Sequence, residues 1–276
     1  MSAITPLARL SFAIAIVAFG IQHLIYGDFV TRVVPKLPAW IPWHPFWAYL
    51  TGIALIVAGG AILFGKGARK AATLLGGAIL LSFVVFYLPL VAAGPPLSGV
   101  WTNAGKALAL SGGALLVSAS LPDDKHGPTG IFHWLNWLIP ASRFFLSAFL
   151  ILAGIQHFLF AAFVATLVPA WIPGHLFWTY FAGIALIAGG LGIIVPITTR
   201  LAALLSGIMI FLWVLVLHIP RAVAAPHDSN ETTAVFEALA MSATAFLIAR
   251  EAYAGPAKVL ASKPARQHKS PRIATQ

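Results

Sequence analysis

The sequence contains no cysteine, and charged residues make up only 9% of its 276 positions. The absence of cysteine excludes disulfides, thiolate metal ligands and dithiol redox chemistry by the chain itself. The scarcity of charge, together with 60% hydrophobic residues and a mean hydropathy of +0.92, excludes an ordinary water-soluble domain. We therefore expect the lipid bilayer to be the main solvent and partner of this protein.

Apolar runs occur in the number expected for a multi-pass membrane protein. A helix needs about 20 residues to cross the hydrocarbon core of a bilayer. Uncharged runs of about this length lie at 46–64, 71–93, 144–168 and 176–197. Weaker runs lie at 7–26, 101–121, 201–225 and 234–249. The sequence thus predicts eight transmembrane helices.

The chain repeats itself over nearly its whole length. The matched segments are 9–23 with 143–157, 38–42 with 169–173, and 106–109 with 237–240. The first pair is offset by 134 residues and the later pairs by 131. A repeat of this size indicates two similar units of four helices each. The Arg-led first run returns in mid-chain, so we expect it to be a retained span and not a cleaved secretory signal.

Lysine and arginine are distributed unequally between the two sides of the predicted membrane. One side holds Arg9, Lys66, Arg69, Lys70, Lys125, Arg143, Arg200, Arg250, Lys258, Lys263, Arg266, Lys269 and Arg272. The other side holds Arg32, Lys36, Lys106 and Arg221. Positive residues stay on the cytoplasmic side, so both termini are predicted to be cytoplasmic. The net charge of +10 is then a signal of topology and lipid contact, and not of nucleic-acid binding.

An even number of spans in each copy gives two repeats that enter the membrane in the same sense. The predicted fold is an all-α integral membrane protein with eight transmembrane helices, arranged as two four-helix bundles. The expected units are repeat one at 1–121, a linker with an interfacial segment at 122–141, repeat two at 142–251, and a basic, disordered tail at 252–276.

Histidine, glutamine and large aromatic residues gather at the same outward loop of both copies. They are Gln22, His23, His44, Trp47 and Tyr49 in copy one, and Gln156, His157, His175, Trp178 and Tyr180 in copy two. One interpretation is structural, because a Pro-rich segment at membrane depth leaves backbone groups that polar side chains must satisfy. The other is a binding site for a quinone headgroup, which needs hydrogen-bond donors and a flat aromatic partner. A histidine could also accept the proton that quinol oxidation releases.

Other cofactors fit these residues less well. Two histidines could hold a haem, but His44 and His175 are predicted to lie on loops and not on facing helices. Zinc is disfavoured because the chain has no cysteine and few carboxylates near the histidines. The sequence therefore predicts no metal site.

A second polar set lies at the outer ends of the third and fourth helices of each copy. It consists of His218, Arg221 and Glu237 in copy two, aligned with Tyr87, Leu90 and Lys106 in copy one. Charges at membrane depth need partners. We expect Glu237 to pair with Arg221, and Lys106 to pair with Asp28. These ions either stabilise the fold or mark a route for protons or solute.

Several of these segments together resemble the DoxX-like membrane proteins. They are Gly-Ile-Gln-His at the end of the first helix, the outward Pro-containing loop, and the Tyr-x-x-Gly-Ile-Ala starts at 49–54 and 180–185. The resemblance implies two fused four-helix units in a bacterial inner membrane. Where such proteins often carry an acidic residue in the second helix, this chain has the apolar runs 52–58 and 183–188.

Two functions follow as expectations. The resemblance implies a redox-associated subunit that binds quinone at the outer face and contacts a redox partner protein. The alternative is a carrier, or an assembly and partner-binding protein without chemistry, for which the parallel repeat and the intramembrane charges are the sequence evidence.

Overall fold

The computed structural model describes residues 4–30, 32, 34–35, 38, 40–122 and 131–261, without the side chains of 131–133 and 253–261. The α-helices are α1 (Ile4–Tyr26), α2 (His44–Phe64), α3 (Ala68–Ser82), α4 (Leu88–Ala93), α5 (Gly99–Ser120), α6 (Ile131–Asn136), α7 (Ser142–Leu159), α8 (Ala161–Ala165), α9 (His175–Ile194), α10 (Thr199–Trp213), α11 (Ile219–Ala224) and α12 (Ser229–Ala261). The other elements are the π-helical segments η1 (Phe83–Tyr87) and η3 (Val214–His218) and the 3-10 helix η2 (Ile139–Ala141). The described residues contain no strand, which confirms the predicted all-α class.

Within the part of the chain that the structure describes, seven helical segments are long and apolar enough to cross a membrane, judged by length and composition. They are Ile4–Tyr26, His44–Phe64, Ala68–Ala93, Trp134–Leu159, His175–Ile194, Thr199–Ala224 and Ser229–Ala252. The span expected at 101–121 corresponds to α5, which has 22 residues but is not among the seven. Polar residues such as Asn103 and Lys106 lower its apolar character. The structure therefore supports a multi-pass helical membrane protein, and the eighth span stays a prediction.

The third helix of each repeat departs from regular α-geometry at the same place. η1 joins α3 to α4 and η3 joins α10 to α11, and a proline lies in the first turn of both α4 and α11. These prolines, Pro89 and Pro220, lack an N–H and crowd the carbonyl four residues earlier, so they interrupt the α-helical hydrogen bonds. A π-helical turn accommodates such an interruption. As a result, Tyr87 and His218 end the two π-segments at equivalent positions.

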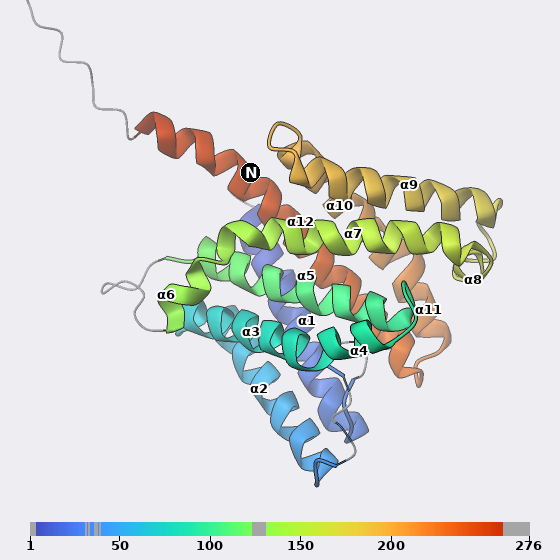
Figure 1. The fold of residues 1–276 in the computed structure, drawn as a ribbon, viewed down its shortest axis with the longest axis horizontal. Helices are drawn as coiled ribbons and strands as arrows, with labels where there is room; N and C mark the ends of the chain where they lie inside the picture. Colours follow the sequence, from blue (N-terminus) through green and yellow to red (C-terminus); the bar gives the residue numbers. More distant parts are fainter. Residues whose placement is uncertain are drawn as a thin grey trace, which may run out of the picture.

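The two repeats are interleaved. Neighbouring helices pack in the same order within each repeat, α1 on α2, α2 on α3 and α3 on α5, matched by α7 on α9, α9 on α10 and α10 on α12. The fourth helix of each repeat then packs on the first helix of the other, α5 on α7 and α12 on α1. Helices α5 and α12 also pack on each other in the middle of the molecule (Figure 1). This arrangement differs from the expected closed four-helix bundle in each repeat, because α1 barely contacts α5 and α7 barely contacts α12.

Glycines bring the first and second helices of each repeat into backbone contact. A Cβ atom on Gly20 would lie 2.6 Å from the carbonyl oxygen of Gly52. A Cβ atom on Gly154 would lie 2.7 Å from the carbonyl oxygen of Gly183. Small residues at helix crossings allow close packing where lipid supplies no hydrophobic driving force. The glycine of the repeated Gly-Ile-Gln-His segment therefore has a packing role.

The predicted linker and tail are described in part. Residues 123–130 lie outside the described part of the chain, and the linker continues as α6 and η2. Trp134 and Trp137 are exposed there, as expected for a segment at the membrane surface. Helix α12 continues to Ala261, ten residues beyond the boundary predicted for the second repeat at 251. The expected disorder then concerns 262–276, which are outside the described residues.

Candidate functional site

The histidine of the repeated motif is bonded to its own helix. Nδ1 of His23 lies 2.7 Å from the carbonyl oxygen of Phe19, and the backbone N–H of Val30 donates to Nε2 at 3.4 Å. A carbonyl only accepts and a backbone N–H only donates, which assigns the proton of the His23 ring to Nδ1. His157 repeats the first contact, with Nδ1 2.7 Å from the carbonyl oxygen of Ala153. The ring of His23 is completely buried, so it lies in the interior of the protein.

The glutamine of the motif ties one repeat to the other. Gln22 on α1 donates to the hydroxyl of Thr232 at 3.0 Å and accepts a hydrogen bond from the hydroxyl of Thr233 at 3.1 Å, both on α12. Gln156 on α7 accepts from the hydroxyl of Thr102 on α5 at 2.9 Å. Thr102 and Thr233 are themselves equivalent positions. The two glutamines therefore make matching contacts across the interface between the repeats.

The other six residues of the predicted quinone site lie elsewhere, in the first two turns of the second helix of each repeat. They are His44, Trp47 and Tyr49 on α2, and His175, Trp178 and Tyr180 on α9. The four aromatic side chains are exposed. The indole N–H of Trp47 donates to the carbonyl oxygen of Pro42 at 3.2 Å, and Tyr180 stacks on Phe158 with ring centroids 5.5 Å apart. The structure thus separates the ten predicted residues into three groups. Gln22, His23 and Gln156 are buried, His44, His157 and His175 are half-buried, and the four aromatic side chains are exposed.

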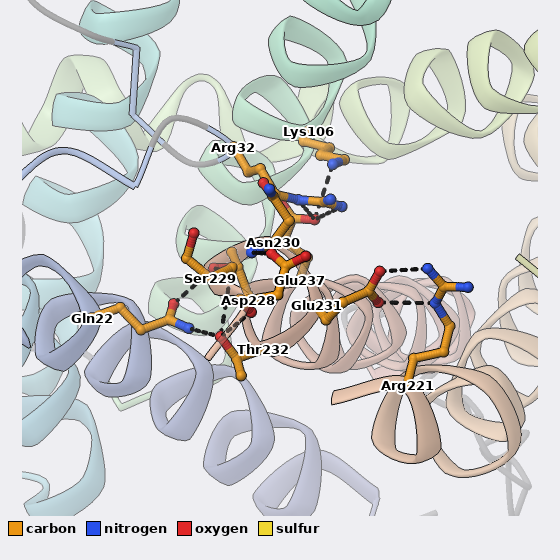
Figure 2. Close-up of polar contacts among 11 residues, drawn as sticks. Gln22, Arg32, Lys106, Arg221, Asp228, Ser229, Asn230, Glu231, Thr232 and Glu237 are labelled. Carbon is orange, nitrogen blue, oxygen red and sulfur yellow. Dashed lines mark hydrogen bonds and ion pairs between the residues drawn. The ribbon is translucent and has the colours of Figure 1, made fainter. Parts of the chain in front are cut away.

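The most concentrated polar arrangement is a cluster of charges between the repeats. Oε2 of Glu237 accepts a hydrogen bond from Nζ of Lys106 at 2.9 Å. The same oxygen accepts from Nη2 of Arg32 at 2.8 Å and from Nε of Arg32 at 3.2 Å. Figure 2 shows Arg32 and Lys106 directed at this one carboxylate. Lys106 comes from α5, Glu237 from α12 and Arg32 from the segment between α1 and α2, so both repeats contribute.

The ends of the two π-helical segments face the same charges. Tyr87 and His218 both interact electrostatically with Glu237, and His218 also interacts with Arg32, Lys106 and Glu231. The hydroxyl of Tyr87 and Oε1 of Glu237 are buried without a hydrogen-bond partner. We call these five residues, Arg32, Tyr87, Lys106, His218 and Glu237, the central cluster.

The predicted ion pairs are wrong in their partners. Lys106 pairs with Glu237 and not with Asp28, whose carboxylate accepts from the backbone N–H of Phe29 at 2.7 Å. Arg221 pairs with Glu231 and not with Glu237 (Figure 2). The physical reason is the packing of α5 on α12, which brings equivalent positions of the two repeats together.

A signal for the correct pair was present in the sequence. Lys106 and Glu237 are equivalent positions, separated by the repeat offset of 131, and carry opposite charges. Equivalent residues meet wherever they lie close to the axis that relates two repeats. Arg32 had no such signal, because it lies in a segment between helices where the offset changes.

The central cluster carries one more positive than negative charge, and the pair at its centre is nearly buried. Side chains of Lys106 and Glu237 are only 10% and 6% exposed. At roughly 1.5 Å per residue, Lys106 lies about 10 Å along α5 from the N-terminal end of that helix, and Glu237 lies about 12 Å along α12 from its N-terminal end. Ionised groups at such a depth are expensive and commonly mark substrate or proton routes in membrane proteins. No group of three or more His, Cys, Asp or Glu that could hold a metal ion occurs among the described residues.

Comparison with known proteins gives one match. Residues 146–254, which run from α7 to α12 in the second repeat, match the family described as Domain of unknown function (DUF8561). No curated protein matches the chain. No solved structure matches it either.

Proposed function

We propose that this protein is a multi-pass membrane carrier that engages a small solute or a proton at the central cluster. The observation that supports this proposal is the position of the Lys106–Glu237 pair, buried at the interface between two repeats. In transporters built from repeats, the substrate site lies at the repeat interface within the membrane. Movement of one repeat against the other would then change the access to the cluster.

A purely stabilising role explains the cluster less well. Desolvating two cations and a carboxylate costs several kcal/mol per ion, and their mutual attraction often does no more than offset that cost. A stabilising pair would also satisfy its polar atoms, whereas Oε1 of Glu237 and the hydroxyl of Tyr87 have no partner. Polar atoms left open beside buried charge are suited to a ligand.

The test is charge movement in proteoliposomes on a solid-supported membrane. Rapid addition of organic anions, amines, sugars or acid should produce a transient current for at least one class of solute. Lys106→Met and Glu237→Gln should abolish that current. The matched control is Arg221→Met combined with Glu231→Gln, which removes an ion pair outside the central cluster and should leave the current in place. The carrier is refuted if the current survives Lys106→Met, or if no solute produces a current.

A second candidate is the redox-associated, quinone-binding subunit that the DoxX-like resemblance implies. The favouring observation is that the outward loops of both repeats expose large aromatic rings, with Trp40 81% and Trp171 70% exposed. Such rings could stack on a quinone headgroup near the outer surface of a bacterial inner membrane. Lipid extracts of the purified protein should then contain quinone, and the double variant His44→Ala, His175→Ala should lose it. Equal quinone in the variant and the parent refutes this role.

A further inference from the structure

We infer that the central cluster binds a small monovalent oxyanion that also carries an O–H group, the class to which hydroxycarboxylates and bicarbonate belong. This inference rests on the proposed function in that both use the same site. It adds the chemical class of the ligand, which the charges and the open hydrogen-bonding positions of the cluster define.

The charge of the cluster favours an anion. Two cations, Arg32 and Lys106, share the single carboxylate of Glu237. A separate ion pair, Arg221 with Glu231, is neutral as a pair. The uncompensated positive charge lies among buried side chains, where it is costly. A ligand with one negative charge would neutralise it, whereas a cation would add to it.

The hydrogen-bonding pattern favours an anion that can also donate. The ammonium of Lys106 has three N–H donors and the guanidinium of Arg32 has five, so both retain donors after binding Glu237. The hydroxyl of Tyr87 is a further open donor, and Oε1 of Glu237 is an open acceptor. Chloride or acetate would satisfy the charge and the donors but leave Oε1 without a partner. An oxyanion with an O–H group would accept from the cations and from Tyr87, and donate to Glu237.

The exposures of the cluster indicate the side from which the ligand approaches. The side chain of Arg32 is 31% exposed, against 6% for Glu237. The side chain of Arg32 is therefore more accessible from the surface than those of Lys106 and Glu237. In the predicted orientation this surface is the outer one.

Equilibrium dialysis of the full-length protein in detergent micelles tests the inference, with radiolabelled glycolate as the probe at constant ionic strength. We expect one saturable site per chain, with bicarbonate competing and an equal concentration of chloride competing much less. Tyr87→Phe should weaken glycolate binding roughly tenfold, as expected for one hydrogen bond to a charged ligand. The matched control is Tyr26→Phe, which alters an exposed tyrosine at the end of α1 and should bind as the parent does.

Two outcomes overturn the inference without any variant having to fold. Absence of saturable glycolate binding to the parent protein rejects the ligand class. Acetate binding as tightly as glycolate rejects the contact between the O–H group and Glu237. The carrier proposal can fail separately. If glycolate binds but yields no current on the solid-supported membrane, the carrier is refuted and the binding site stands. If another class of solute yields a current and glycolate does not bind, the carrier stands and the ligand class is refuted.

Discussion

Three residues of the Gly-Ile-Gln-His segment make different contacts. Gly20 lets α1 approach the backbone of α2, Gln22 binds two threonines of α12, and His23 binds the backbone at the end of its own helix. These contacts point in three directions from one helical turn. A substitution at any of the three positions should therefore affect stability through a distinct mechanism.

Gly20→Ala should destabilise the protein by about 1–3 kcal/mol, the usual cost of overpacking a tight contact. The added methyl group would lie 2.6 Å from the carbonyl oxygen of Gly52, so the two helices must move apart. Gly60→Ala is the control, because a Cβ atom there meets nothing within 4 Å. The measurement is thermal unfolding of the purified protein in detergent. Equal midpoints for the two variants would contradict the close crossing of α1 and α2.

Gln22→Leu should destabilise the protein by about 1–3 kcal/mol, because it removes two hydrogen bonds across the repeats, one to Thr232 and one from Thr233. A double-mutant cycle with Thr233→Val separates the Thr233 contact from general damage. We expect the double variant to be more stable than the sum of the two single losses predicts, since no polar atom of the pair is then left unpaired. Simple additivity in thermal unfolding would show that Gln22 and Thr233 do not interact.

At the scale of the helix, the central feature is the exchange of partners between repeats. α12 packs on α1 and α5 packs on α7, so the first helix of each repeat is covered by the last helix of the other. The π-helical segments then direct Tyr87 and His218 toward the charges that α5 and α12 carry. π-helical turns often occur at functional sites, and here one occurs in each repeat.

Reversal of the charges tests the contact between α5 and α12. Lys106→Glu should destabilise the protein strongly, by about 3–5 kcal/mol, because two buried carboxylates would then face each other. Adding Glu237→Lys restores opposite charges, and we expect it to recover part of the loss in thermal unfolding. Recovery is incomplete because Arg32 keeps its place beside position 237. A double variant no more stable than Lys106→Glu alone would show that the two residues are not in contact.

At the scale of the whole molecule, the sequence predicted the class of protein and the repeat, but not how the repeats combine. Apolar runs and a nearly constant offset between the copies are local signals, so the helices were predicted close to their positions. The partners of Lys106 and Arg221 depend on which helices pack together, and the sequence of one repeat is equally consistent with a closed bundle and with an exchanged one. Arg32 was missed as a member of the cluster for the same reason.

The orientation in the membrane can be measured directly because the chain has no cysteine. A single cysteine can replace Trp40 or Trp171, which are equivalent, exposed positions of the two repeats. It can also replace Lys66 or Ile197, a second equivalent and exposed pair, which lies at the other end of the second helix of each repeat. With a membrane-impermeant maleimide, we expect Trp40→Cys and Trp171→Cys to react in intact cells. Lys66→Cys and Ile197→Cys should react only after permeabilisation, because the positive-inside distribution places them in the cytoplasm.

The equivalent pairs make this labelling a test of the parallel repeat as well as of orientation. An even number of spans in each repeat requires both members of a pair to react from the same side. If Trp40→Cys and Trp171→Cys react from opposite sides, the first repeat has an odd number of spans, and α5 does not cross the membrane. If both pairs react with the sides exchanged, the parallel repeat holds and the predicted orientation is reversed. The unsubstituted protein, which cannot react, gives the background for every measurement.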